Sequence, residues 1–177
     1  MEKWLIVKFI ASVWDVKRAV CPGSFDPITY GHLDVVARAS HHFDQVIVAV
    51  FENRSKSSLF TVEERKSMIR EATEKFPNVV VDSWHGLTVD YCKANGVNTI
   101  VRGLRAVTDF DYELQIAQVN LQLAGVETMF MATAPAHSFL SSTLVKELAH
   151  YGGDVTSMVP PNIVRALRER LFATGGE

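Results

Sequence analysis

The chain has 177 residues, of which 47% are hydrophobic and 21% are charged, and its formal net charge is −2. This length fits one α/β domain, and the composition excludes an intrinsically disordered chain. The small negative charge provides no general attraction to nucleic acid or to anionic membranes, so we expect neither as a partner.

The first residues are interpreted as an N-terminal extension of unknown structure over residues 1–18, followed by a single domain over residues 19–177. The apolar run Trp4–Trp14 is interrupted by Lys8 and Ser12, and it is too short to cross a bilayer. A signal peptide is not indicated, because a single lysine precedes the run and no A-x-A-like cleavage site follows it.

The two cysteines, Cys21 and Cys92, do not form a CxxC pair. This spacing argues against a zinc site and against a disulfide framework, and it fits a protein of the reducing cytoplasm. No group of His, Cys and Asp has the spacing of metal ligands, so the sequence predicts no resident metal.

Five short apolar runs alternate with helical patterns along the rest of the chain. The predicted strands are Ala19–Cys21, Gln45–Phe51, Asn78–Asp82, Thr99–Val101 and Glu127–Ala132. The second of them is almost continuously apolar, as is typical of a parallel strand covered on both faces. Strands that alternate with helices predict a Rossmann-like, doubly wound α/β fold with a five-stranded parallel sheet and C-terminal helices.

The helices show start and stop signals. They are predicted over Gly31–Phe43, Val62–Phe76, Leu87–Asn95, Asp109–Ala124, Ser142–Tyr151 and Pro161–Leu171. Thr61 and Glu64 form a capping box at the second helix, and Gly96 ends the third. Ser142 is predicted to cap the helix that runs to Tyr151.

The helix predicted over residues 109–124 carries two apolar stripes, although a surface helix needs only one. The first stripe consists of Phe110, Leu114, Ala117 and Leu121, and the second of Tyr112, Ile116, Val119 and Leu123. The second stripe must therefore meet another element or another subunit.

Residues 22–32, PGSFDPITYGH, join the first predicted strand to the first predicted helix. Gly23 allows a tight backbone approach, and Ser24 offers a hydroxyl and an N–H group. Gly31 and His32 lie at the helix N-terminus, where unsatisfied N–H groups and the helix dipole favour anions. The His32 imidazole can donate a hydrogen bond to a phosphate there. These residues alone leave two interpretations open, a phosphate-binding turn and a strand–helix turn with an exposed histidine.

Other polar residues follow the ends of the remaining predicted strands. In an open parallel sheet, ligands bind beyond the carboxyl ends of the strands. The residues expected at this edge are Ser24, Lys56, Leu87, Thr88, Arg102, Arg105 and the segment 137–143. A mildly acidic chain would thus collect positive charge around one cleft, as a polyphosphate ligand requires.

The segment PGSFDPITYGH resembles the nucleotidylyltransferase superfamily with the T/H-x-G-H motif, in the form seen in the bacterial phosphopantetheine adenylyltransferase family. Further blocks resemble the same family in order and at its spacing. They are KSSLFTVEER at 56–65, IVRGLR at 100–105, DFDYE at 109–113, SFLSSTLVKE at 138–147 and GGDV at 152–155. The resemblance covers residues 19 to 171 and leaves the first 18 residues without a counterpart.

This resemblance implies transfer of AMP from ATP to 4'-phosphopantetheine, which yields dephospho-coenzyme A and pyrophosphate. It implies in-line attack without a covalent intermediate, Mg²⁺ that arrives with ATP, and a homohexamer. A phosphate monoester has a second pKa of about 6, so the attacking group needs no general base. Two alternatives stay open: a sibling enzyme acting on nicotinamide mononucleotide or a polyol phosphate, and a non-catalytic nucleotide-binding regulator.

The resemblance also implies roles for individual residues. His32 would be the catalytic residue and would stabilise the α-phosphate during transfer. The ATP-binding residues that it implies are Ser24, Phe25, His32, Gly103, Leu104, Arg105, Glu113, His137, Ser138, Phe139, Leu140, Ser141, Ser142 and Thr143. The residues that it implies for binding the acceptor are Ser24, Lys56, Thr88 and Arg102.

Overall fold

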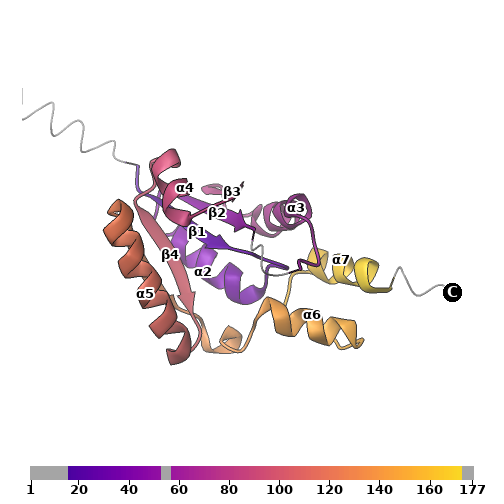
Figure 1. Ribbon diagram of the computed structural model, residues 1–177. Coiled ribbons are helices and arrows are strands. Elements are labelled where there is room, and N and C mark those ends of the chain that lie inside the picture. The colour runs from indigo at the N-terminus through magenta and orange to yellow at the C-terminus, as the bar shows by residue number, and fades with distance from the viewer. Residues whose placement is uncertain (1–15, 53–56, 173–177) are drawn as a thin grey trace, which may run out of the picture.

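The computed structural model describes residues 16–52 and 57–172. In these ranges the strands are β1 (Arg18–Gly23), β2 (Gln45–Phe51), β3 (Val79–Trp84), β4 (Thr99–Leu104) and β5 (Glu127–Ala132). They form one sheet in the order β3-β2-β1-β4-β5, and all neighbouring strands are parallel (Figure 1). The predicted five-stranded, Rossmann-like parallel sheet is therefore confirmed.

Helices cover both faces of this sheet. They are α2 (Tyr30–Ser40), α3 (Val62–Thr73), α4 (Thr88–Asn95), α5 (Val107–Ala124), α6 (Ser142–His150) and α7 (Pro161–Phe172), with a short 3₁₀ helix, η1 (Pro135–His137), after β5. In Figure 1, β4 lies between α5 and α2, which shows the two helical layers. None of these described helices is long and apolar enough to pass through a bilayer.

The side chains of β1 alternate between two buried clusters. Ala19 and Cys21 face a cluster that includes residues of α2, α3, α6 and α7, whereas Val20 faces a second cluster that includes residues of α4. Successive strand side chains point to opposite faces, so both faces of β1 need a helical cover. The apolar character of the central strands follows directly from this double burial.

Predicted element ends differ from the structure in three places that concern the site. Helix α2 begins earlier than predicted, because Thr29 caps it, and it also ends earlier, with His41 as its C-cap. Strand β4 continues to Leu104, which pairs with Ala132 of β5. The N-cap of α6 is Ser141, whose hydroxyl accepts the N–H of Leu144 at 3.1 Å, so the prediction that Ser142 caps this helix is wrong.

Two other local predictions are confirmed. Thr61 and Glu64 form a capping box at α3, and Gly96 ends α4 with a left-handed φ of 62°. Strand β1 begins at Arg18, inside the predicted extension over residues 1–18. Residues 1–15 lie outside the described ranges.

Candidate active site

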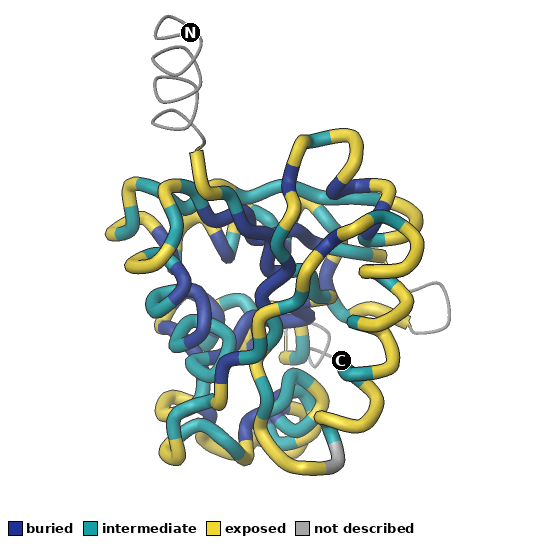
Figure 2. Tube along the Cα trace, turned by 90° about the vertical axis from the view of Figure 1, so that its left-hand side faces the viewer, coloured by how far each residue is buried: buried dark blue, intermediate teal, exposed yellow. Residues whose placement is uncertain are grey.

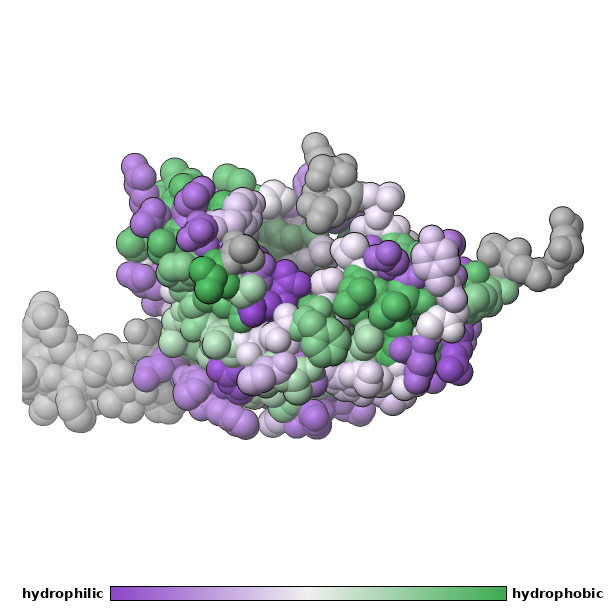
Figure 3. All heavy atoms as spheres, turned by 90° about the horizontal axis from the view of Figure 1, so that it is seen from below, coloured by the Kyte–Doolittle hydropathy of each residue, from purple (hydrophilic) through white to green (hydrophobic). Residues whose placement is uncertain are grey.

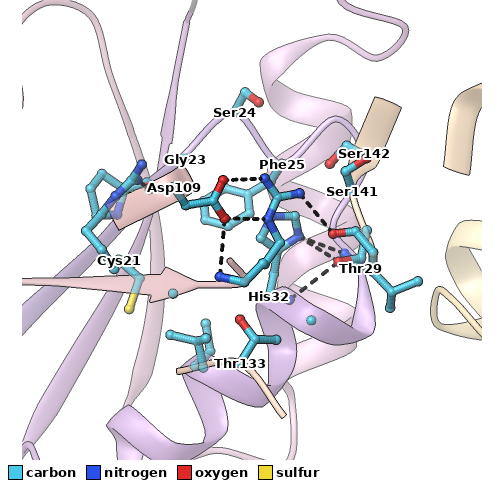
Figure 4. Close-up of a pocket in the computed structure, with 18 of the residues that line it drawn as sticks. Cys21, Gly23, Ser24, Phe25, Thr29, His32, Asp109, Thr133, Ser141 and Ser142 are labelled. Carbon is cyan, nitrogen blue, oxygen red and sulfur yellow. Dashed lines mark hydrogen bonds and ion pairs between the residues drawn. The ribbon is translucent and has the colours of Figure 1, made fainter. Parts of the chain in front are cut away.

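Two cavities open beyond the carboxyl ends of the strands and share one wall. The first has a volume of about 400 Å³ and lies between β4 and the starts of α2 and α6 (Figure 4). The second has a volume of about 590 Å³ and reaches toward α4 and α5. Both are lined by Pro22, Gly23, Ser24, Arg102 and Glu113. Two ligands bound in these cavities would therefore meet at Ser24 and Arg102.

The turn after β1 is tightly folded. Phe25 has a φ of 46°, a left-handed conformation that is uncommon for a residue with a side chain. Its buried ring lies directly over Gly23, where a Cβ atom would come within 2.9 Å of the ring. Glycine fits at position 23 because any side chain there would require the ring of Phe25 to move. The ring of Phe25 also packs edge-on against the imidazole of His32, at 5.2 Å between centroids.

His32 is oriented by the residue that caps its own helix. The backbone N–H of Thr29 donates to Nδ1 of His32 at 3.0 Å, and the Thr29 hydroxyl lies at the same distance from that nitrogen (Figure 4). A backbone N–H can only donate, so Nδ1 of the neutral ring must be the unprotonated nitrogen. The proton is therefore on Nε2, and the ring is a hydrogen-bond donor toward its environment. His32 lines the first cavity.

The charge state of His32 follows from its surroundings. Burial of the ring lowers the pKa of His32 to about 4, and the nearby positive charges of Arg105 and Arg102 act in the same direction. The imidazole is therefore neutral at physiological pH. It offers a fixed N–H group without a positive charge of its own.

Arg102 stands on the wall between the cavities and is held by three hydrogen bonds. Its Nε donates to Oε2 of Glu113 at 2.8 Å, its Nη2 donates to Oε1 of Glu113, and its Nη1 donates to the carbonyl of Pro22 at 2.6 Å. A bidentate pair of this kind fixes the plane of the guanidinium. Arg102 is thus positioned before any ligand binds.

Arg105 lies at the mouth of the first cavity and is held by Asp109. Its Nε and Nη2 donate to the two oxygens of Asp109, each at 3.1 Å, and its Nη1 donates to the carbonyl of Leu140 at 3.2 Å. The hydrogen bonds from Arg105 outweigh desolvation and lower the pKa of Asp109 below its usual value. Asp109 stays ionised, and Arg105 links the start of α5 to the segment before α6. Figure 3 shows the face of the molecule toward which β4 points in Figure 1. On this face, hydrophilic side chains lie between apolar patches.

The start of α6 and the two residues before it line the first cavity. They are Leu140, Ser141, Ser142 and Thr143, which are all predicted ATP-binding residues. The segment from His137 to Phe139, which was predicted to contact ATP, does not line either cavity.

A 3₁₀ turn at residues 135–137 positions this segment, and its contact with ATP stays a prediction. The turn stacks the ring of His137 on that of Tyr30, with 6.1 Å between the centroids and 28° between the ring planes, and it leaves Phe139 59% exposed. Leu104, the last residue of β4, also lines neither cavity, and its carbonyl accepts the N–H of Thr133. Gly103 does line the first cavity, close against Val35 of α2.

In the second cavity, the wall formed by α4 and α5 is more apolar than the wall shared with the first cavity. Thr88, at the start of α4, lines it as expected for an acceptor site, together with Leu87 and residues of α5. Besides Glu113, the α5 residues in this wall include Tyr112, Ile116 and Asn120. Lys56, the remaining predicted acceptor residue, lies outside the described residues.

Several polar residues around the site escaped the sequence analysis. Asp26, Asp34 and Asp109 each anchor a segment that borders the first cavity, and Thr29 orients His32. Only Asp109 had a usable sequence signal, since it follows Arg105 by four positions at the start of a helix. Asp26 and Asp34 bind partners that are distant in the chain. Thr29 caps its own helix, and helix propensity alone does not reveal that contact.

Within residues 16–52 and 57–172, no three His, Cys, Asp or Glu side chains come close enough together to hold a metal ion. The two carboxylates that line the first cavity, Asp109 and Glu113, are both engaged by arginines.

Comparison with known proteins places the chain among nucleotidyltransferases. A family model described as cytidylyltransferase-like matches residues 20–148. The phosphopantetheine adenylyltransferase of Frankia alni is 62% identical over 159 residues, which cover 88% of this chain and 98% of that protein. The proteins of the same name from Streptomyces coelicolor and Thermobifida fusca are 60% and 54% identical, and the matches cover 98% and 94% of their lengths and 88% of this chain.

Among solved structures, a proposed nicotinate-nucleotide adenylyltransferase from Vibrio parahaemolyticus has a TM-score of 0.63. It is 18% identical in sequence, and the match covers 86% of this chain and 98% of that one. At this identity the likeness concerns the fold alone.

Proposed function

The chain belongs to the phosphopantetheine adenylyltransferases within the cytidylyltransferase-like family, and we propose that it transfers AMP from ATP to 4'-phosphopantetheine. The products are dephospho-coenzyme A and pyrophosphate, as in a late step of coenzyme A biosynthesis. The observation that carries this proposal is the pair of cavities that meet at Ser24 and Arg102, with His32 on the side of the first.

In the proposed reaction, ATP occupies the first cavity and the acceptor occupies the second. A phosphate oxygen of the acceptor attacks the α-phosphorus and forms a new P–O bond, while the bond to the bridging oxygen breaks and pyrophosphate leaves. The acceptor phosphate is already ionised at neutral pH because its second pKa is about 6, so no residue needs to remove a proton. The protein has to align two anions and to stabilise the charge that develops between them.

Different residues of the site would bind the two substrates and stabilise the charge that develops on the α-phosphate. His32 would donate its Nε2–H to an oxygen of the α-phosphate, because Nδ1 is occupied by the Thr29 N–H. Arg105 and the start of α6 would hold the phosphates of ATP, where the N-terminal N–H groups of the helix favour anions. Arg102 would bind the phosphate of the acceptor from the shared wall, and we expect Lys56 to assist it.

Glu113 is proposed to act mainly through Arg102. Both of its oxygens accept hydrogen bonds from that guanidinium, so it is a positioning residue rather than a direct ligand of ATP. Thr88 would line the pantetheine arm in the second cavity.

Mg²⁺ is expected to enter with ATP and to neutralise part of the phosphate charge. Its ligands would be phosphate oxygens and water, because the carboxylates of Asp109 and Glu113 are paired with Arg105 and Arg102. We also expect the enzyme to act in the cytoplasm, with which its two buried thiols, Cys21 and Cys92, are compatible.

The exposed side of α5 is the basis for proposing that the protein self-associates. Tyr112, Ile116, Val119 and Leu123 form one stripe along this helix and are between 40% and 65% exposed. Figure 2, in which the side bearing α5 faces the viewer, shows this helix with little buried surface. An apolar stripe of this length on an exposed helix is typical of a subunit interface. We propose that it mediates assembly, with the homohexamer implied by the family as the expected state.

The function is tested by incubating the protein with ATP, Mg²⁺ and one acceptor at a time. The acceptors are 4'-phosphopantetheine, nicotinamide mononucleotide and a polyol phosphate, and the readouts are pyrophosphate release and the mass of the adenylated product. Product with phosphopantetheine alone is expected. Product with nicotinamide mononucleotide but none with phosphopantetheine would overturn the acceptor assignment, and ATP binding without any product would indicate a nucleotide-binding regulator.

A further inference from the structure

A buried carboxylate lies beneath the phosphate-binding turn and does not line either cavity. The Asp26 side chain is only 6% exposed, and it accepts hydrogen bonds from three donors. They are the N–H of Leu59 at 3.0 Å, the N–H of Phe60 at 2.9 Å and Nζ of Lys146 at 2.7 Å. Asp26 therefore joins the turn to two segments that are distant in the chain.

One of these segments, α6, forms part of the site. Lys146 lies one turn into α6, which begins with two residues that line the first cavity, Ser142 and Thr143. A second hydrogen bond, from the Ser142 hydroxyl to the carbonyl of Pro27 at 2.7 Å, joins the same two segments. The turn that carries Ser24 and the start of α6 are thus held together at two neighbouring points.

The electrostatics of Asp26 fit a fixed role in the folded protein. Burial raises the pKa of Asp26, but the hydrogen bonds from Lys146, Leu59 and Phe60 outweigh it, and the pKa lies below its usual value. The carboxylate is therefore ionised and paired at neutral pH. A buried ion pair often contributes little net stability compared with apolar residues, so its main consequence here is a defined geometry between two segments.

We propose that Asp26, through its ion pair with Lys146, is a positioning residue that sets the phosphate-binding turn against the start of α6. The proposal rests on the proposed function, in which ATP phosphates lie between these two segments. Neither residue lines the first or the second cavity, so neither touches a substrate in this arrangement. Loss of the pair lets the turn shift relative to α6. Alignment of the α-phosphate with His32 and with the attacking oxygen is then lost.

This role predicts a particular kinetic signature. Misalignment by about 1 Å reduces the fraction of bound substrate in a reactive geometry, and such shifts cost up to about a hundredfold in rate. The contacts that bind ATP remain present, so its KM changes less than kcat does. A purely structural ion pair would instead lower the thermal midpoint and leave kcat unchanged.

The test compares three variants of the full chain. Lys146→Met removes the charge, Lys146→Arg keeps it, and Lys66→Met is the matched control. Lys66 forms an ion pair of similar length with Glu63, at 2.9 Å on α3, and it lines neither cavity. We expect Lys146→Met to lower kcat at least tenfold with less than about a threefold change in the KM for ATP, and Lys146→Arg to restore most of kcat. Lys66→Met should turn over like the wild type.

Hydrogen exchange followed by mass spectrometry supplies a readout that does not depend on turnover. Faster exchange in residues 22–32 of Lys146→Met, with unchanged exchange in the sheet, is expected. Unchanged kcat and unchanged exchange in Lys146→Met would overturn the proposal, as would an equal loss of kcat in Lys66→Met.

Asp26→Asn provides a second route if Lys146→Met does not fold. It keeps the volume of the side chain and should reproduce the loss of kcat and the faster exchange, whereas wild-type values for both would contradict the proposal. If the wild type itself makes no product with phosphopantetheine, the proposed function fails, while the exchange measurement still decides whether Lys146 holds the turn.

Discussion

Both oxygens of the Glu113 carboxylate are bound by the guanidinium of Arg102, on the wall that the two cavities share. An amide at position 113 has one acceptor oxygen and an NH₂ group that repels the guanidinium N–H groups. We therefore expect Glu113→Gln to raise the KM for phosphopantetheine about tenfold, with a smaller effect on the KM for ATP. Steady-state kinetics with each substrate varied in turn provide the measurement.

Glu71→Gln is the matched control for this prediction. Glu71 faces Arg165 at 3.8 Å in an exposed ion pair, and it lines neither of the two cavities. Loss of the Glu71 carboxylate should leave the KM for phosphopantetheine and the KM for ATP unchanged. A rise in the KM for ATP alone in Glu113→Gln would show that Glu113 contacts the nucleotide directly.

Removal of the His32 imidazole should act on the chemical step. We expect His32→Ala to lower kcat about 10²–10³-fold, the usual loss when one preorganised hydrogen-bond donor is removed. His41→Ala is the control, because His41 is an exposed residue at the end of the same helix. Turnover near the wild-type rate in His32→Ala would refute the assigned role.

The low pKa of His32 makes protein stability depend on pH in a defined window. The ordinary value of 6.5 applies to the unfolded chain, and burial lowers it to about 4 in the folded protein. As the pH falls through 6.5, the unfolded state binds a proton that the folded state does not bind, so stability decreases until about pH 4. Above about pH 6.5 the contribution of this group is constant.

Urea unfolding of the free enzyme at about pH 7.5 and about pH 5 tests this window. The loss of unfolding free energy between the two should be about 2 kcal/mol larger in the wild type than in His32→Gln, which has no imidazole to protonate. Equal losses in both proteins would mean that His32 titrates with an ordinary pKa.

Arg105 should determine the affinity for ATP. Its guanidinium is fixed by Asp109 and by the Leu140 carbonyl at the mouth of the first cavity. We expect Arg105→Ala to raise the KM for ATP at least tenfold with little effect on the KM for the acceptor, since a charge-assisted contact to phosphate would be lost. Arg165→Ala, at an exposed position of α7, serves as the control, and an unchanged ATP KM in Arg105→Ala would exclude this contact.

The apolar stripe of α5 should control assembly. Val119 is 47% exposed on this helix, and an aspartate there would place a charge in the proposed interface. We expect Val119→Asp to reduce the molar mass measured by light scattering, whereas Gln118→Glu, at an exposed polar position of the same helix, should not. A wild-type protein that is monomeric at all concentrations would rule out the interface.

The sequence by itself determined the architecture and the centre of the site. The apolar run Gln45–Phe51 and the regular alternation of strands and helices encode a doubly covered parallel sheet, because each pattern depends on neighbours within a few residues. The sequence also predicted that the turn around His32 lies near Arg102 and Arg105, because the carboxyl ends of parallel strands meet at one edge of the sheet.

The tertiary structure alone decided how these groups are held. Asp26 meets Lys146 across 120 positions of the chain, and Arg102 reaches the carbonyl of Pro22 across 80. The stacking of His137 against Tyr30 likewise joins residues that are distant in the chain. Contacts at such separations leave no periodic trace in a sequence, because they depend on how whole elements pack and not on the order of adjacent residues.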